Sequence, residues 1–164
     1  MPNLVLDAAG APAIVREKRL VLRVLAIWRD ACEEDVLPRV GAFTPSDTGD
    51  DADHVYLLDV LYPAGPRFTY VGAALRVAGW PSTVDAPLDH CPPESVLSLA
   101  SYRWQEIVDR RVPITRGGPG FNDGEAVLYR SIMAPLVDET GRVSAILGAA
   151  NWRLVTAGDG VPSA

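Results

Sequence analysis

The pattern of hydrophobic and polar residues is clearest near the C-terminal end of the chain. Two apolar segments, residues 127–136 and 142–152, flank the polar sequence Asp138-Glu-Thr-Gly141, which favours a chain reversal with a positive φ. The segments predict the two strands of a long β-hairpin. Both carry apolar residues at odd and at even positions, whereas a sheet with one solvated face alternates apolar and polar residues. We therefore expect other elements to cover both faces of this hairpin.

A second pattern, near the start of the chain, is helical. From about residue 12 to residue 34, apolar residues recur at three- and four-residue spacing and predict one amphipathic helix. Basic residues come early in this helix and acidic residues late, so its charges oppose the helix dipole. Packing has to compensate, and the helix should lie on the sheet or on a second copy of itself. The stripe comprises Leu20, Val24, Ile27 and Ala31, widened by Val21, Leu25, Trp28 and Cys32.

The middle of the chain predicts strands and helices in alternation. Two strands should pair as a hairpin, and a helix opened by Pro92-Pro-Glu-Ser95 should run to about residue 110 with Leu97 and Trp104 on one face. This order predicts an antiparallel α+β domain. The remaining expected elements are strands over 55–61, 67–71 and 112–115, a short helical turn over 72–79, an irregular segment over 81–93 and a loop over 117–120.

These elements divide the chain into three parts. Residues 1–36 hold the leading helix, which serves packing and dimerisation, and residues 37–153 form the main domain. Residues 154–164 are rich in glycine and small residues, and such a composition predicts a disordered tail.

Composition excludes several classes of protein. The chain has 164 residues, enough for one domain with a sizeable core. We expect no membrane insertion, because no apolar run approaches spanning length, and a cytoplasmic location, because the N-terminus does not resemble a secretory leader. The net charge of −6 argues against a large nucleic-acid interface, which needs clustered cations.

Several short segments, taken together, resemble a family of known fold. They are Leu25-Ala-Ile-Trp28, the connector from Leu37-Pro38 to Thr44-Pro45, Val55-Tyr-Leu-Leu-Asp59, Arg67-Phe-Thr-Tyr-Val-Gly72, and the hairpin segments 129–136 and 143–149. In order and spacing they resemble the short, single-domain PAS proteins of alphaproteobacteria, over most of residues 20–153. The resemblance implies a PAS-like five-stranded antiparallel sheet with helices on one face, together with an N-terminal helix. One departure is Tyr70, which stands where family members commonly carry an arginine.

The motifs leave the cofactor unknown. The haem-binding members of the family commonly use a histidine on the long central helix as the axial ligand, and residues 95–110 contain none. The light-sensing flavin members carry a Gly-x-Asn-Cys-Arg-Phe motif, which this sequence lacks. Neither haem nor flavin is therefore supported. The acidic run from Ser46 to Asp53 does not have the spacing of a calcium loop, and we expect no metal site.

Arg130 is the most informative candidate for a ligand-binding residue. Counted by twos it shares a strand face with Leu128 and Ile132, and a buried arginine needs an anionic partner. If this face lines a cavity, Arg130 could bind a carboxylate or phosphate group; otherwise it reaches solvent or pairs with Asp59 or Asp123. Weaker ligand candidates, of types that more often belong to the core, are Tyr70, Trp104, Met133 and Asn151.

The resemblance implies a non-enzymatic sensory or regulatory module in signal transduction. A small ligand or a signalling protein partner would shift the packing of the leading helix, and the module would dimerise through Leu25 and Trp28. Two alternatives stay open. One is a cone-shaped α+β isomerase or dehydratase, which needs a poised acid or base and would use Asp59, His54 or Tyr129. The other is a ligand-free dimeric interaction scaffold.

Overall fold

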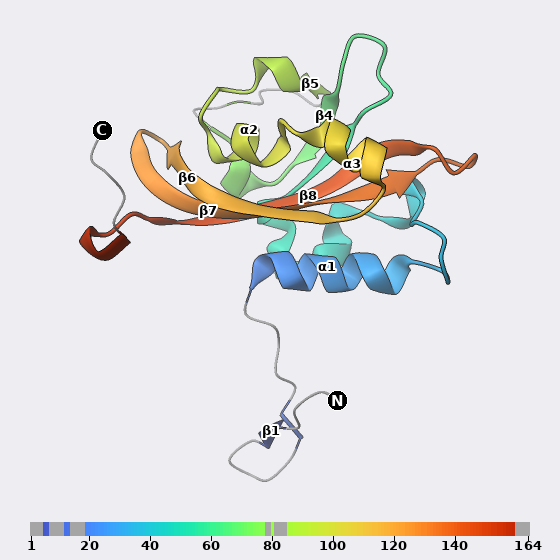
Figure 1. The fold of residues 1–164 in the computed structure, drawn as a ribbon, viewed down its shortest axis with the longest axis horizontal. Helices are drawn as coiled ribbons and strands as arrows, with labels where there is room; N and C mark the ends of the chain where they lie inside the picture. The colour runs from blue at the N-terminus through green and yellow to red at the C-terminus, as the bar shows by residue number, and fades with distance from the viewer. Residues whose placement is uncertain (1–4, 7–11, 14–18, 78–79, 81–84, 160–164) are drawn as a thin grey trace.

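The chain is seen here as a computed structural model, which describes residues 5–6, 12–13, 19–77, 80 and 85–159. Its centre is a six-stranded antiparallel sheet with the order β5-β4-β3-β8-β7-β6. Helix α1 lies against one face of this sheet, and α2 and α3 lie against the other (Figure 1). The bounds are α1 Leu20–Ala31, β3 Val55–Asp59, β4 Arg67–Val71, β5 Ala86–Pro87, α2 Val96–Ser101, α3 Trp104–Arg110, β6 Ile114–Asn122, β7 Glu125–Val137 and β8 Val143–Leu154.

The predicted long hairpin is confirmed as β7 and β8. Their pairing runs without interruption from Val127 opposite Leu154 to Leu136 opposite Ala145. The turn between them has the expected chemistry, because Gly141 adopts a φ of +83° and the Asp138 carboxylate accepts hydrogen bonds from the backbone N–H groups of Thr140 and Arg142. The Thr140 hydroxyl also donates to this carboxylate. That bond is the largest cause of the lowered pKa of Asp138, and the two backbone bonds lower it further.

Both faces of the hairpin are covered, as the apolar pattern predicted. One cluster of buried residues packs between the sheet and α1, and it includes Val24, Ile132 and Leu147. A second cluster packs between the sheet and α2 and α3, and it includes Leu97 and Ile146. The side chains of β7 and β8 therefore alternate between two cores, and these two strands join the elements on opposite faces.

The leading helix is shorter than predicted. Helix α1 begins at Leu20, and Pro12–Ala13 instead pair as a short strand, β2, with Val5–Leu6, β1. The expected helix start at residue 12 is therefore wrong, and residues 14–18 lie outside the described part. At the other end Cys32 adopts an extended conformation, so the helix stops before the acidic residues 33–35 that would oppose its dipole.

Two other predictions of local structure are wrong. The helix expected over 95–110 is two helices, α2 and α3, separated at Tyr102 and Arg103; Ser95 caps the first by accepting a hydrogen bond from the Ser98 N–H. The loop expected over 117–120 is the middle of strand β6. Glycine and proline are tolerated there because β6 is an edge strand of the sheet, where one side needs no ladder partner.

Three further segments were predicted as a short helical turn, an irregular segment and a disordered tail. The short helical turn lies at Ala73–Leu75, and residues 78–79 and 81–84 lie outside the described part. The expected irregular segment contains the two-residue strand β5, which extends the predicted five-stranded sheet at its edge next to β4. Leu154 ends β8, and Ala157–Asp159 form a 3-10 helix, η5, within the tail that was predicted to be disordered; residues 160–164 lie outside the described part.

Besides its apolar stripe, a polar contact of Arg23 attaches helix α1 to the body. The Arg23 guanidinium donates from Nε and one terminal nitrogen to the two carboxylate oxygens of Asp51, each at 2.8 Å. Asp51 belongs to the 3-10 helix η2, Pro45–His54, which leads into β3. A two-bond arginine–carboxylate contact fixes orientation as well as distance, so this pair sets the position of α1 along the sheet.

Candidate functional site

The layer between the sheet and α2–α3 is filled by side chains. Tyr56 is fully buried there and lies over Gly148, its direct partner in the neighbouring strand. Its hydroxyl donates to the Ala100 carbonyl at 3.1 Å, and burial raises the pKa of that hydroxyl. The Phe68 ring contacts the Tyr56 ring edge to face, with the ring centres 5.6 Å apart. The described side chains of this layer pack into one buried cluster.

The predicted ligand residues do not all come together. Met133 is buried in the layer beneath α2 and α3, and Trp104 of α3 packs against the same cluster of residues. Tyr70 lies among the residues on the α1 side of the sheet, where its hydroxyl donates to the Ala52 carbonyl at 3.0 Å. Only Arg130 and Asn151 meet, because they stand directly opposite each other on β7 and β8.

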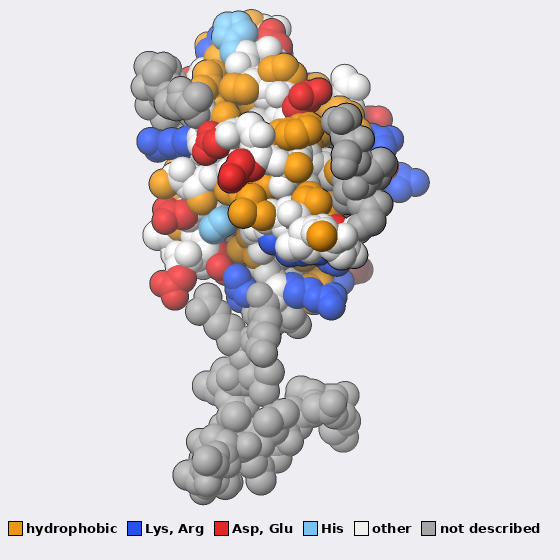
Figure 2. All heavy atoms as spheres, turned by 90° about the vertical axis from the view of Figure 1, so that its left-hand side faces the viewer, with side chains coloured by type: hydrophobic (Ala, Val, Ile, Leu, Met, Phe, Trp, Pro, Cys, Tyr) orange, Lys and Arg blue, Asp and Glu red, His pale blue; other side chains and the backbone are white. Residues whose placement is uncertain are grey.

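Arg130 and Asn151 lie in a groove on the α1 face of the sheet. The groove has a volume of about 710 Å³ and lies between the first turn of α1 and the ends of β6, β7 and β8. In Figure 2, which looks onto this end of the molecule, basic side chains gather at the lower edge of the described surface. The lining residues are Arg19, Val21, Leu22, Thr115, Arg116, Gly117, Gly118, Leu128, Tyr129, Arg130, Ser131, Asn151, Trp152 and Arg153.

Strand register explains why Arg130 and Asn151 share a face. Arg130 is paired with Gly117 of β6 on one side and with Asn151 of β8 on the other. Ile132, two residues along β7, packs in the core beneath α1, so Arg130 points to the same face. Because α1 begins at Leu20, it covers Ile132 but leaves Arg130 exposed at the end of the helix.

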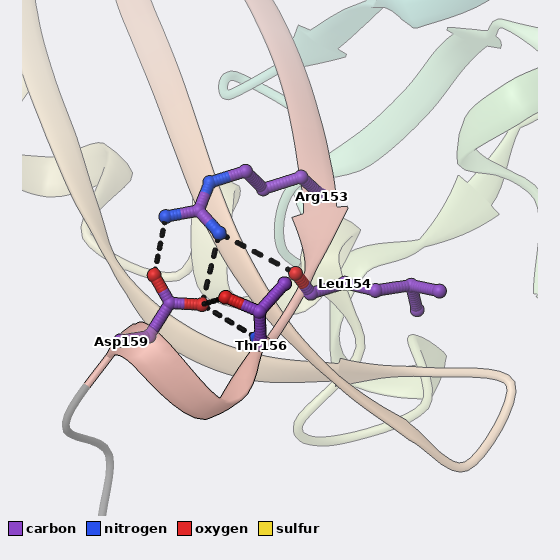
Figure 3. A network of polar contacts seen from close by, with 4 residues as sticks. All are labelled: Arg153, Leu154, Thr156 and Asp159. Atoms are coloured by element: carbon purple, nitrogen blue, oxygen red, sulfur yellow. Dashed lines mark hydrogen bonds and ion pairs between the residues drawn. The ribbon is translucent and has the colours of Figure 1, made fainter.

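Two of the other arginines that border the groove are held by carboxylates, and the side chain of Arg116 is on the opposite face of the sheet. Arg116 is paired with Glu106 of α3. Figure 3 shows that Arg153 binds both carboxylate oxygens of Asp159, at 2.9 and 2.6 Å, while Asp159 also accepts hydrogen bonds from Thr156. These contacts lower the pKa of Asp159, with the Arg153 hydrogen bond as the largest cause.

Arg130 differs from both. Within the described part of the chain it has no hydrogen bond or ion pair, neither with Asp59 nor with Asp123. Its guanidinium therefore keeps its full donor capacity facing the groove and solvent.

The candidate residues of the enzyme alternative are separated. Asp59 is paired with Ala145 at one end of β8, while Tyr129 is paired with Trp152 near the other end, roughly 23 Å away at about 3.3 Å per residue. The Asp59 carboxylate accepts a hydrogen bond from the Leu61 N–H, which gives it a role in the turn. His54 contacts Trp152 and donates from Nδ1 to the Ala150 carbonyl at 3.0 Å. The three groups do not converge on one pocket.

Among the residues that the structure describes, no three His, Cys, Asp or Glu side chains are grouped so that they could hold a metal ion. Within the same ranges, no helix has both the length and the apolar character needed to cross a membrane.

The residues expected at a dimer interface have different surroundings. Trp28 is only 7% exposed, and its indole N–H donates to the Pro135 carbonyl of its own chain at 2.9 Å. Leu25 is half-buried at the margin of the same stripe. Trp28 therefore packs α1 onto its own sheet, and Leu25 is the residue of the pair that keeps surface for another molecule.

Sequence reasoning missed most of the groove. The neighbours of Arg130 that were not recognised are Arg116, Gly117 and Arg153. They lie 13 to 23 residues from it along the chain, and only strand pairing brings them near. The signal that could have found Arg153 is the alternation of β8, in which it follows Asn151 by two positions. Gly117 could not have been placed, because the segment that contains it was predicted to be a loop.

Several solved structures resemble this fold distantly. No family model and no curated protein matches the sequence. The light-state LOV domain of the photoreceptor Aureochrome1 is 14% identical over 62% of this chain and 87% of its own, with a TM-score of 0.45. A light-oxygen-voltage domain studied with a flavin analogue is 17% identical over 68% and 82%, with a TM-score of 0.47. The PAS domain of BvgS from Bordetella pertussis is 14% identical over 62% and 74%, with a TM-score of 0.40.

The fold assignment therefore stands on the architecture itself. The sequence predicted a hairpin near the N-terminal side, central helices and a long C-terminal hairpin within one antiparallel sheet. The structure has these elements in that order, with β3 and β8 paired at the centre of the sheet and α2 and α3 over one face. The chain has an antiparallel α+β fold, with its elements in the order that the sequence predicted.

Proposed function

We propose that the protein is a non-enzymatic sensory or regulatory module of the cytoplasm. The observation that carries this proposal is the attachment of α1 to the sheet face opposite α2 and α3, through strands that contribute to both cores. A ligand or partner that contacts either end of α1 changes the balance between its packed and released positions, which is a population shift. The separation of Asp59, His54 and Tyr129 gives the enzyme alternative no support.

The proposed response requires α1 to open without global unfolding. We expect amide hydrogen exchange in the full chain to be at least tenfold faster in α1 than at Ile132 and Leu147 in the central strands, because locally opening elements exchange below the global free energy. Arg23→Gln, which breaks the contact with Asp51, should speed the exchange of α1 further. Arg29→Gln, on the exposed side of α1, is the matched control and should not.

One result would contradict this mechanism. If α1 and the central strands exchange at the same rate in the wild-type protein, α1 leaves the sheet only when the whole domain unfolds. A signal could not then be carried by repacking of α1 alone.

We also propose that the module forms a homodimer in which Leu25 contributes to the interface. Replacing Leu25 with glutamate should convert the dimer to a monomer in light scattering, because it places a charge in an apolar contact. Trp28→Phe, which changes a residue facing the chain's own sheet, should leave the molar mass unchanged. A monomeric wild-type protein, or a dimer that survives Leu25→Glu, would contradict this interface.

The filled layer under α2 and α3 favours one second candidate, a ligand-free interaction scaffold. Tyr56 and Phe68 belong to one buried, packed cluster, and protein contacts alone could then carry the signal. The groove at Arg130 separates the two candidates, because a scaffold has no use for a small-molecule site there.

A further inference from the structure

The groove between α1 and the strand ends presents arginine side chains in an acidic protein. The whole chain has a net charge of −6, yet three arginines, Arg19, Arg130 and Arg153, line the groove on the α1 face, and none of the described lining residues is Asp or Glu. Concave surfaces lined by charges of one sign concentrate ions of the other sign. The first turn of α1, which contains no acidic residue, adds the positive end of its helix dipole.

Arg130 is the group in this groove that can act on a ligand. Arg116 and Arg153 are engaged with Glu106 and Asp159, whereas no described carboxylate binds Arg130. A guanidinium presents a planar fork of donors that matches a carboxylate or a phosphate with two hydrogen bonds. The Asn151 amide, directly opposite on β8, supplies a further donor beside this fork.

Glycine keeps the groove open at this point. Gly117 is the partner of Arg130 on β6, and it places no side chain over the guanidinium. On the other side, Leu22 and Leu128 line the groove and give an apolar surface next to the charged one. A volume of about 710 Å³ falls within the range of roughly 300–1,000 Å³ that is typical of small-molecule sites.

We infer that this groove binds a small organic anion, whose carboxylate or phosphate group is held by Arg130 and Asn151 and whose short apolar part lies against Leu22 and Leu128. The inference rests on the proposed regulatory function and names its ligand class. Because the first turn of α1 forms one wall of the groove, a bound anion contacts the helix and the sheet together. Binding therefore stabilises the packed position of α1.

The test uses the ¹⁵N-labelled full chain with inorganic phosphate and succinate as separate probes, at ionic strength held constant with sodium chloride. We expect saturable shifts of the Arg130 Nε–H and Asn151 side-chain amide signals with at least one probe. Arg130→Gln should weaken that binding at least tenfold. Arg39→Gln removes the same charge from an exposed arginine outside the groove, and it should change the dissociation constant less than twofold.

Each outcome decides a different point. Saturation by phosphate alone identifies a phosphate group as the ligand feature, saturation by succinate alone identifies a carboxylate, and saturation by both supports anion recognition in general. Absence of saturable shifts at Arg130 and Asn151 with both probes overturns the inference, as does an equal loss of binding in Arg130→Gln and Arg39→Gln. Saturable binding that leaves the hydrogen exchange of α1 unchanged keeps the site but contradicts the proposed regulation through α1.

Discussion

Gly148→Ala should destabilise the protein by about 3 kcal/mol, at the upper end of the usual cost of overpacking a core. A Cβ at this position would overlap the Tyr56 ring, which lies directly over the Gly148 backbone. The ring has little room to move, because its hydroxyl is bonded to Ala100 and its edge contacts Phe68. Urea unfolding followed by circular dichroism measures the change.

The matched control is Gly41→Ala, because a Cβ at Gly41 meets nothing within 4 Å. We expect this exchange to change the free energy of unfolding by less than about 1 kcal/mol. In a Tyr56→Leu background, which removes the ring, Gly148→Ala should cost much less, and the double-mutant cycle then isolates the contact. A cost of Gly148→Ala no greater than that of Gly41→Ala would show that the Tyr56 ring is not held over β8.

This contact shows where sequence reasoning reached its limit in the fold. The apolar run of β8 was sufficient to predict a strand buried on both faces. Gly148 within that run could have indicated a close approach by another group, but the identity of that group depends on the pairing of β3 with β8. Tyr56 lies 92 residues away along the chain, and no local pattern connects the two.

The errors in the predicted elements have a related cause. Glycine and proline over residues 117–120 favour a loop when only the local sequence is considered, but pairing with β7 extends them as an edge strand. The apolar stripe of α1 was predicted from its spacing, and its central residues Val24 and Trp28 are buried as the stripe requires. The predicted start of the helix was wrong because the apolar stripe shows which side of α1 is buried but does not show at which residue the helix begins.

The candidate site was predictable only in part. Arg130 and Asn151 were both selected from the sequence, for separate reasons, and strand register places them opposite each other. Trp104 and Met133 were also named as weaker ligand candidates, but they belong to the layer beneath α2 and α3. Side-chain alternation assigns Arg130 to one face, but only the position of α1 determines that this face holds a groove.

Trp28→Ala should cost about 3–5 kcal/mol of stability, the range for truncating a large aromatic residue in a core. Trp28 is the largest side chain by which α1 packs onto the sheet, and its indole N–H satisfies the Pro135 carbonyl. Strand β6 begins opposite Met133, so at Pro135 the outer edge of β7 has no strand partner. The indole thus caps an edge that would otherwise present a buried carbonyl without a donor.

Trp28→Phe separates the two contributions. It keeps most of the apolar contact and removes the donor, so we expect a loss of about 1–2 kcal/mol, the cost of leaving one buried acceptor unsatisfied. Arg29→Ala, at the adjacent exposed position, should stay within about 0.5 kcal/mol of wild type. If Trp28→Ala and Arg29→Ala unfold at the same urea concentration, α1 does not contribute to the stability of the sheet, and its packing could not respond to a ligand in the groove.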